Sequence, residues 1–211
     1  MLNDYTIRLE KETDYRAVEE LTRETFWNLY KPGCAEHYVL HTYRSKPEFV
    51  RELDFVMEKD GRLIGHVMFV RAEINSDEGR KIPIMTFGPI SILPEFQRRG
   101  YGRALLDYAL SKAAEMGVGA VCMEGNINFY RNCGFTVAST LGIHYYAEPR
   151  DAEVPYFLAR ELKKGFLDGV TGVYHTPEGY FVDDKDVEDF DKSFPPKKKL
   201  KLTGQLFKTE K

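Results

Sequence analysis

Apolar residues recur along the chain at two spacings, one typical of helices and the other of strands. From residue 14 to residue 26, and again from 101 to 116, they return every three or four positions, so each segment is predicted to be an amphipathic helix. Gly117 ends the second of these helices. Another helix is expected over residues 34–43, after Pro32-Gly33 has ended the first.

Strand patterns fill much of the remaining chain. Residues 55–58 and 63–73 flank Asp60-Gly61, a dipeptide typical of two-residue hairpin turns because both residues tolerate positive φ. A third strand over residues 81–93 completes an antiparallel meander. Shorter strands are expected at residues 5–9, 120–123, 135–138, 156–162 and 170–175, and helical segments at 127–133 and 183–191. A meander followed by alternating helices and strands predicts a mixed α/β sheet.

The regular pattern loosens near residue 149. We therefore expect residues 1–148 to form the core and residues 149–211 to form a C-terminal extension packed on it. Pro195-Pro196 followed by three lysines, Lys197 to Lys199, indicates an extended basic arm on the surface near the end of this extension.

Composition narrows the class of protein. With 211 residues, 43% hydrophobic and 30% charged, the chain has the balance of a globular domain. A net charge of −3 gives no overall field for nucleic acid, and no apolar run approaches the ~20 residues that span a membrane. The charged start lacks the apolar region of a secretory signal, and three unpaired-looking cysteines favour a reducing, cytoplasmic setting.

A glycine-rich turn precedes the strongest helix and carries the first candidate chemistry. It reads Gln97-Arg98-Arg99-Gly100-Tyr101-Gly102, followed by Arg103. Glycines at a helix start let the backbone approach a ligand, the free amides and the helix dipole attract phosphate, and arginines add positive charge. The turn lacks the Gly-Lys-Ser/Thr of a Walker loop and the third glycine of a dinucleotide site. A diphosphate site and a merely solvated turn both fit.

The strand before this turn favours a ligand. Pro89 has no amide to donate within a sheet, so we expect a bulge at Gly88-Pro89 that frees the backbone of Ile90, Ser91 and Ile92. An extended, amide-bearing pantetheine can pair with such a strand, and its diphosphate then reaches the following helix start. This order of strand and phosphate turn predicts an acyl-coenzyme A site, with acetyl-CoA as the expected ligand.

At these positions the chain resembles the GCN5-related N-acetyltransferase (GNAT) superfamily. The matching blocks are Ile90-Ser91-Ile92-Leu93-Pro94, Gln97-Arg98-Arg99-Gly100-Tyr101-Gly102, Phe129-Tyr130 and Gly134-Phe135, and the similarity covers roughly residues 5–140. The resemblance implies a GNAT-type fold, a mixed and mostly antiparallel twisted sheet with a bulged, splayed central strand flanked by helices. The C-terminal part is similar to the tail of an extended, poorly characterised bacterial and archaeal branch.

The resemblance also implies an activity and roles for residues. It implies direct acetyl transfer from acetyl-CoA, in a ternary complex, to a primary amine of a small molecule or peptide. Backbone amides at residues 90–92 would bind the thioester oxygen, and Tyr130 would protonate the departing thiolate. For the general base, Glu124, His66, a water relay and an already neutral amine all stay open. Dimerisation is common in the family, so a homodimer is an open expectation.

Several alternatives accompany this interpretation. The same fold could serve as a non-catalytic acyl-CoA sensor or interaction module. His37 and His41 share a helix face, a geometry that can bind metal, but no third ligand has matching spacing, so no metal site is expected. Aromatic residues of the first helices are expected to line the acceptor side: Phe26, Trp27, Tyr30, Tyr38 and Tyr43. Cys122 and Cys133 are expected to be small buried hydrophobes.

Overall fold

A computed structural model describes residues 4–205. Residues 1–3 of the predicted core and residues 206–211 of the predicted extension lie outside the described residues. Within this range nine strands form one sheet. They are β1 (Thr6–Leu9), β2 (Phe55–Lys59), β3 (Arg62–Ser76), β4 (Lys81–Ile92), β5 (Ala120–Glu124), β6 (Thr136–Val137), β7 (Ile143–Tyr145), β8 (Phe157–Glu161) and β9 (Gly172–Tyr174).

The strand order confirms the mixed, mostly antiparallel sheet. Along the main path the order is β1-β2-β3-β4-β5-β8-β6, while β9 pairs with the far end of β3 and with β7. The β4–β5 and β7–β9 pairs are parallel, and the other pairings are antiparallel. The meander predicted from the Asp60-Gly61 turn is β2-β3-β4.

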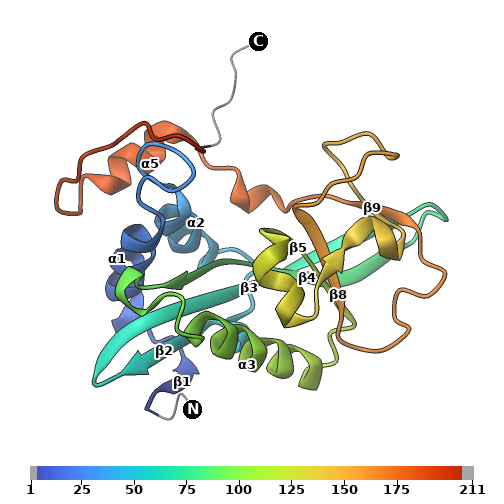
Figure 1. Ribbon diagram of the computed structural model, residues 1–211, viewed down its shortest axis with the longest axis horizontal. Coiled ribbons are helices and arrows are strands. Elements are labelled where there is room, and N and C mark those ends of the chain that lie inside the picture. Colours follow the sequence, from blue (N-terminus) through green and yellow to red (C-terminus); the bar gives the residue numbers. More distant parts are fainter. Residues whose placement is uncertain (1–3, 206–211) are drawn as a thin grey trace.

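Helices cover both faces of the sheet. The helices are α1 (Tyr15–Phe26), α2 (Glu36–Tyr43), α3 (Tyr101–Glu115), α4 (Ile127–Tyr130) and α5 (Asp184–Asp191). In Figure 1, α1 and α2 lie together on one side of β3 and β4, α3 runs along the other side, and α5 lies beside α2. The sequence predicted four of these helices within two residues of their observed ends, at 14–26, 34–43, 101–116 and 183–191.

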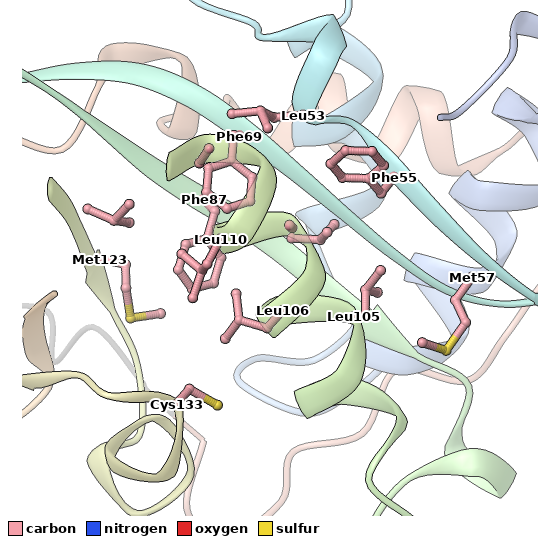
Figure 2. Close-up of a cluster of buried hydrophobic side chains, with 14 of the residues drawn as sticks. Leu53, Phe55, Met57, Phe69, Phe87, Leu105, Leu106, Leu110, Met123 and Cys133 are labelled. Atoms are coloured by element: carbon pink, nitrogen blue, oxygen red, sulfur yellow. The ribbon is translucent and has the colours of Figure 1, made fainter. Parts of the chain in front are cut away.

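Two cores follow from the period-two alternation of side chains along β2 and β3. Phe55, Met57 and Phe69 face α3 and pack with Leu105 and Leu106, as Figure 2 shows. The intervening residues of the same strands point to α1 and α2, where they form a second cluster; these are Val56, Met68 and Val70. Burial of both faces explains why the pattern at residues 63–73 is almost continuously apolar.

The predicted bulge lies in β4. Ile90 pairs with Val67 and Phe87 pairs with Phe69, so Gly88 and Pro89 together stand opposite the single residue Met68. The Gly88–Pro89 peptide bond is cis, and Gly88 has a φ of 140°. Beyond this point β4 leaves its other neighbour: the β4–β5 register consists of Met85 opposite Val121. The two strands therefore part on the side where β4 ends.

The C-terminal segment is built into the sheet as well as packed on it. β8 lies between β5 and β6, pairing with Ala120 to Glu124 on one side. The basic stretch near residues 197–199 follows the surface of α1: the Trp27 Nε1 donates to the Lys198 carbonyl oxygen at 3.0 Å, and Lys197 pairs with Glu24 at 2.6 Å. The β7 strand was not predicted, since its residues carry no alternating pattern long enough to recognise.

Among residues 4–205, none of the helices has the length and apolar character needed to cross a membrane.

Candidate active site

A cavity of about 810 Å³ occupies the gap between the diverging strands β4 and β5. Its walls come from β4, the turn before α3, α4, the start of α2 and the C-terminal segment around residues 174–181. A volume in this range is typical of small-molecule and cofactor sites. The cavity therefore lies where the sheet offers backbone groups that no neighbouring strand uses.

The glycine-rich turn forms one end of this cavity. Gly100 is the N-cap of α3 and has a left-handed φ of 92°, while Arg98 has a φ of 58°. The Gln97 side-chain Nε2 donates to the Ile92 carbonyl oxygen at 2.9 Å, which fixes the turn against the end of β4. The first amides of α3 have no partner within the helix and, with the helix dipole, make this end suited to an anion.

Most of the residues expected to bind the cofactor line the cavity. They are Ile90, Ile92, Gln97, Arg98, Gly100, Gly102 and Arg103. Arg103 lies 3.3 Å from Asp107, one helical turn away, whereas Arg98 makes no ion pair with any described residue. Two arginines and the helix start thus place positive charge at this end.

Three of the expected residues have side chains elsewhere. Ser91 is fully buried, and its hydroxyl shares a 3.0 Å hydrogen bond with Thr22. Tyr101 is buried, with its ring 5.9 Å from that of Tyr5. The Arg99 guanidinium lies 6.0 Å from the ring centre of Phe96. For the buried Ser91 and Tyr101 only the main chain is available to a ligand in the cavity, whereas the Arg99 side chain is exposed.

Tyr130 lies at the wall formed by α4. Its side chain is only 8% exposed and is held among the rings of Phe87, Phe129 and Phe135. A Cβ at Gly125 would lie 2.4 Å from Cε2 of this ring, so the absence of a side chain there lets the ring approach β5. Burial raises the pKa of Tyr130, which keeps the phenol protonated at neutral pH.

Glu124 ends β5, next to the glycine that the Tyr130 ring touches. Its Oε1 accepts a 2.7 Å hydrogen bond from the Thr176 hydroxyl, which is also 3.2 Å from the Tyr145 hydroxyl. Glu124 and Tyr130 both line the cavity. The structure thus brings together the acid and base candidates that lie on separate elements in the sequence.

The C-terminal segment supplies lining residues that sequence reasoning missed, namely Tyr174, Thr176, Tyr180 and Phe181. No motif marks them, and they lie about 50 residues beyond Tyr130, so only the tertiary fold assembles them. From the region of α1 and α2 the cavity takes Phe26 and Tyr30, both expected, and Glu36, which was not expected. The other aromatic residues expected there do not line it; they are Trp27, Tyr38 and Tyr43.

His66, the second base candidate, faces a different region. It is buried on β3, with Nε2 2.7 Å from Asp54 Oδ1, and it is not among the cavity-lining residues. Burial lowers the pKa of His66 to about 4. Burial also raises the pKa of Glu10 to about 7 and that of Asp54 to about 6. His66 therefore belongs to a buried cluster of ionisable groups rather than to the cavity.

This cluster also brings potential metal ligands together, which spacing alone did not indicate. Ligand atoms of Glu10, Asp54 and His66 lie within 4.8 Å of one another. Arg44 already pairs with Glu10 at 2.7 Å, so a cation is present beside these carboxyls. His37 and His41, the pair considered from the sequence, have separate partners: Asp191 lies 3.2 Å from His37, and Glu19 lies 2.8 Å from His41.

Comparisons with known proteins agree with this geometry. The Acetyltransferase (GNAT) family matches residues 17–135, more than half of the chain. An uncharacterised N-acetyltransferase of Escherichia coli, YjhQ, is 27% identical over 135 residues, which cover 64% of this chain and 71% of that protein.

Two solved structures share the fold. The E. coli GNAT protein YhbS, in complex with CoA, superposes with a TM-score of 0.72 at 24% identity, covering 84% of this chain and 92% of that one. A GNAT acetyltransferase of Brucella melitensis, in complex with acetyl-CoA, gives a TM-score of 0.66 at 21% identity, covering 84% and 98%.

The splayed sheet and the glycine-rich helix start define a protein of the acyltransferase class. The chain belongs to the acetyltransferase (GNAT) family, the acetyl-CoA-dependent N-acetyltransferases.

Proposed function

We propose that this protein transfers the acetyl group of acetyl-CoA to a primary amine of a small molecule or peptide, by direct attack in a ternary complex. The observation that carries the proposal is that one cavity joins the bulged strand, the phosphate-type turn, Tyr130 and Glu124. A donor thioester and an acceptor amine can meet there without a covalent enzyme intermediate. The thiols of Cys122 and Cys133 are buried, and burial raises the pKa of each, which disfavours a thiolate nucleophile.

Acetyl-CoA is proposed to bind along β4 and across the start of α3. The backbone at Ile90 to Ile92, past the bulge, pairs with the pantetheine amides and directs an N–H at the thioester oxygen. The diphosphate lies against the first amides of α3, with Arg98 and Arg103 beside it. The bound CoA of YhbS and acetyl-CoA of the Brucella protein support this assignment.

The reaction needs one proton removed and one supplied. The amine nitrogen attacks the thioester carbon, the new C–N bond forms, and the C–S bond breaks to release the CoA thiolate. Glu124 takes the proton that the amine loses, directly or through a water molecule, and Tyr130 gives its phenolic proton to the thiolate. Return of a proton from Glu124 through solvent restores the phenol, so the products are the N-acetyl amine and CoA.

Glu124 is preferred to His66 as the base because it lines the cavity. A base must lie within hydrogen-bond reach of the proton it removes, or one water away. His66 is engaged with Asp54 and does not line the cavity.

The competing function is a non-catalytic acyl-CoA sensor, and Tyr130→Phe separates the two. We expect the wild-type protein to release CoA from acetyl-CoA in the presence of mixed primary amines. The variant should lose about 10²-fold or more in kcat, the usual contribution of a general acid, while still binding acetyl-CoA. Tyr146→Phe, at an exposed tyrosine outside the cavity, is the matched control. Acetyl-CoA binding without turnover across a broad amine panel would instead establish the sensor.

A further inference from the structure

The lining of the cavity carries charges of opposite sign on different elements. Among the described residues that line it, the basic side chains are Arg98 and Arg103, both at the turn assigned to phosphates. The acidic ones are Glu36, at the start of α2, and Glu124, at the end of β5. The walls outside the turn therefore offer negative charge that the donor's phosphates do not need.

Glu36 has no cation of its own. Its Oε2 accepts a 2.9 Å hydrogen bond from the Ala35 amide, and no ion pair joins it to any residue of the described chain. Lys31, the cation that acts on it electrostatically, is paired with Asp184 at 2.8 Å. Burial raises the pKa of Glu36, and backbone hydrogen bonds and the charge of Lys31 offset only part of this effect. A cationic ligand would lower the remaining cost of the buried charge.

Aromatic side chains line the same cavity as the two carboxylates. Phe181 is 62% exposed and Tyr30 is 48% exposed, although both line the cavity. Burial raises the pKa of both Tyr30 and Tyr130, and the charge of Glu36 adds to the effect on Tyr30. Aromatic faces bind both alkyl chains and ammonium or guanidinium groups.

We infer that the preferred acceptor is a small amine that carries a second positive group, such as an α,ω-diamine. This rests on the proposed function, because Glu124 then faces the amine that is acetylated. Glu36 binds the second cation at the other wall, and the aromatic side chains contact the chain between the two groups. A monoamine of equal length fills the same space but leaves Glu36 without its ion pair.

The test compares two series of substrates. Acetylation is measured for α,ω-diamines of three to eight carbons and for n-alkyl monoamines of the same lengths, with wild type, Glu36→Gln and Glu153→Gln. Glu153 is exposed and outside the cavity, so its variant makes the same change of charge without touching the site. We expect the best diamine to exceed its monoamine by roughly tenfold or more in kcat/KM, as one charge-assisted contact allows.

Glu36→Gln should lower the ratio of kcat/KM for the diamine to kcat/KM for the monoamine most of the way to one, mainly through a higher KM for the diamine. Glu153→Gln should leave this ratio unchanged. Acetyl-CoA binding by Glu36→Gln reports that the variant is folded. Equal kcat/KM for diamines and monoamines in wild type, or an equal loss on both series in Glu36→Gln, would overturn this inference while the proposed function stands. Absence of turnover with every amine would overturn both.

Discussion

The hydroxyl of Tyr180 donates a hydrogen bond to the Gly88 carbonyl oxygen over 3.0 Å. It joins residues 92 positions apart, one on the C-terminal segment and the other in the bulge of β4. The Tyr180 ring also packs against Tyr43 of α2 at a centroid distance of 4.8 Å. A carbonyl that the bulge releases from the sheet is thus satisfied by a segment that lines the cavity.

Replacement of this tyrosine tests whether the C-terminal segment shapes the acceptor end. Tyr180→Phe keeps the ring but leaves the Gly88 carbonyl without its donor, so the free energy of unfolding should fall by about 1 kcal/mol. KM for the amine should rise severalfold, with a smaller change in the affinity for acetyl-CoA. Urea denaturation and steady-state kinetics measure these effects, and Tyr146→Phe is the control for loss of a hydroxyl. An affinity loss confined to acetyl-CoA would contradict this role.

A second prediction concerns the helix start at Gly100. Its φ of 92° lies in the left-handed region, where a residue with a Cβ costs about 1–2 kcal/mol. Gly100→Ala should distort the amides that face the diphosphate and lower kcat/KM for acetyl-CoA by about tenfold. A tenfold loss corresponds to a free energy of the same size as this strain. With S-acetylpantetheine, which has no diphosphate, the loss should be much smaller. Equal losses with both donors would show that the turn does not serve the phosphates.

The cofactor side of the site could be predicted from the sequence because its residues lie close together along the chain. Pro89 cannot donate within a ladder, and the glycines of residues 97–102 mark a helix start, so the bulge and the turn follow from short-range chemistry. Both occur where they were expected. The side chains of Ser91 and Tyr101 point into the core because neighbouring residues in strands and helices face different sides.

Outside the cofactor turn, the cavity lining was predicted only in part, at Phe26, Tyr30 and Glu124, because its other residues come from distant segments. Glu36 and Glu124 belong to α2 and β5, Thr176 and Tyr180 lie in the C-terminal segment, and no periodicity relates them. The partnership of His66 with Glu10 and Asp54 is equally non-local, since β1's end, β2 and β3 meet only in the sheet. Such contacts depend on strand register rather than on any property of a short window.

A third prediction follows from His37, which is fully buried against Phe190 and Phe194 and lies 3.2 Å from Asp191. Burial lowers the pKa of His37 from 6.5 to about 4. Between these values the unfolded chain binds more protons than the native protein, so stability rises with pH through this window and is lost as pH falls through it. The contribution of this one group is at most about 3 kcal/mol.

Denaturant titrations at pH values from 4 to 7.5 measure this dependence. His37→Gln should show a shallower rise in the free energy of unfolding between pH 4 and 6.5 than wild type. His175→Gln removes an exposed histidine and should retain the wild-type slope. The buried His66 is present in wild type and in both variants, so its contribution to the slope is the same in all three. Parallel curves for wild type and His37→Gln would mean that the His37 imidazole titrates alike in the folded and unfolded chains.

The last prediction separates a base from a binding carboxylate at Glu124. An alkyl amine with a pKa near ~10 is almost wholly protonated at pH 7, so removal of its proton limits the reaction unless the enzyme supplies a base. Glu124→Gln should therefore lower kcat/KM by about 10²-fold at pH 7. The deficit should shrink as pH rises, since each unit by which pH rises toward the amine pKa gives roughly ten times more neutral amine.

The measurement is the pH profile of kcat/KM from pH 6.5 to 9.5, with a monoamine acceptor so that binding of a second cation does not enter. Glu178→Gln, an exposed residue outside the cavity, controls for the change in charge. A deficit that stays constant across the profile would assign Glu124 to positioning of the acceptor alone. In that case the Thr176 hydroxyl, which donates to Glu124 at 2.7 Å, would be orienting a binding group, and the amine would lose its proton to water.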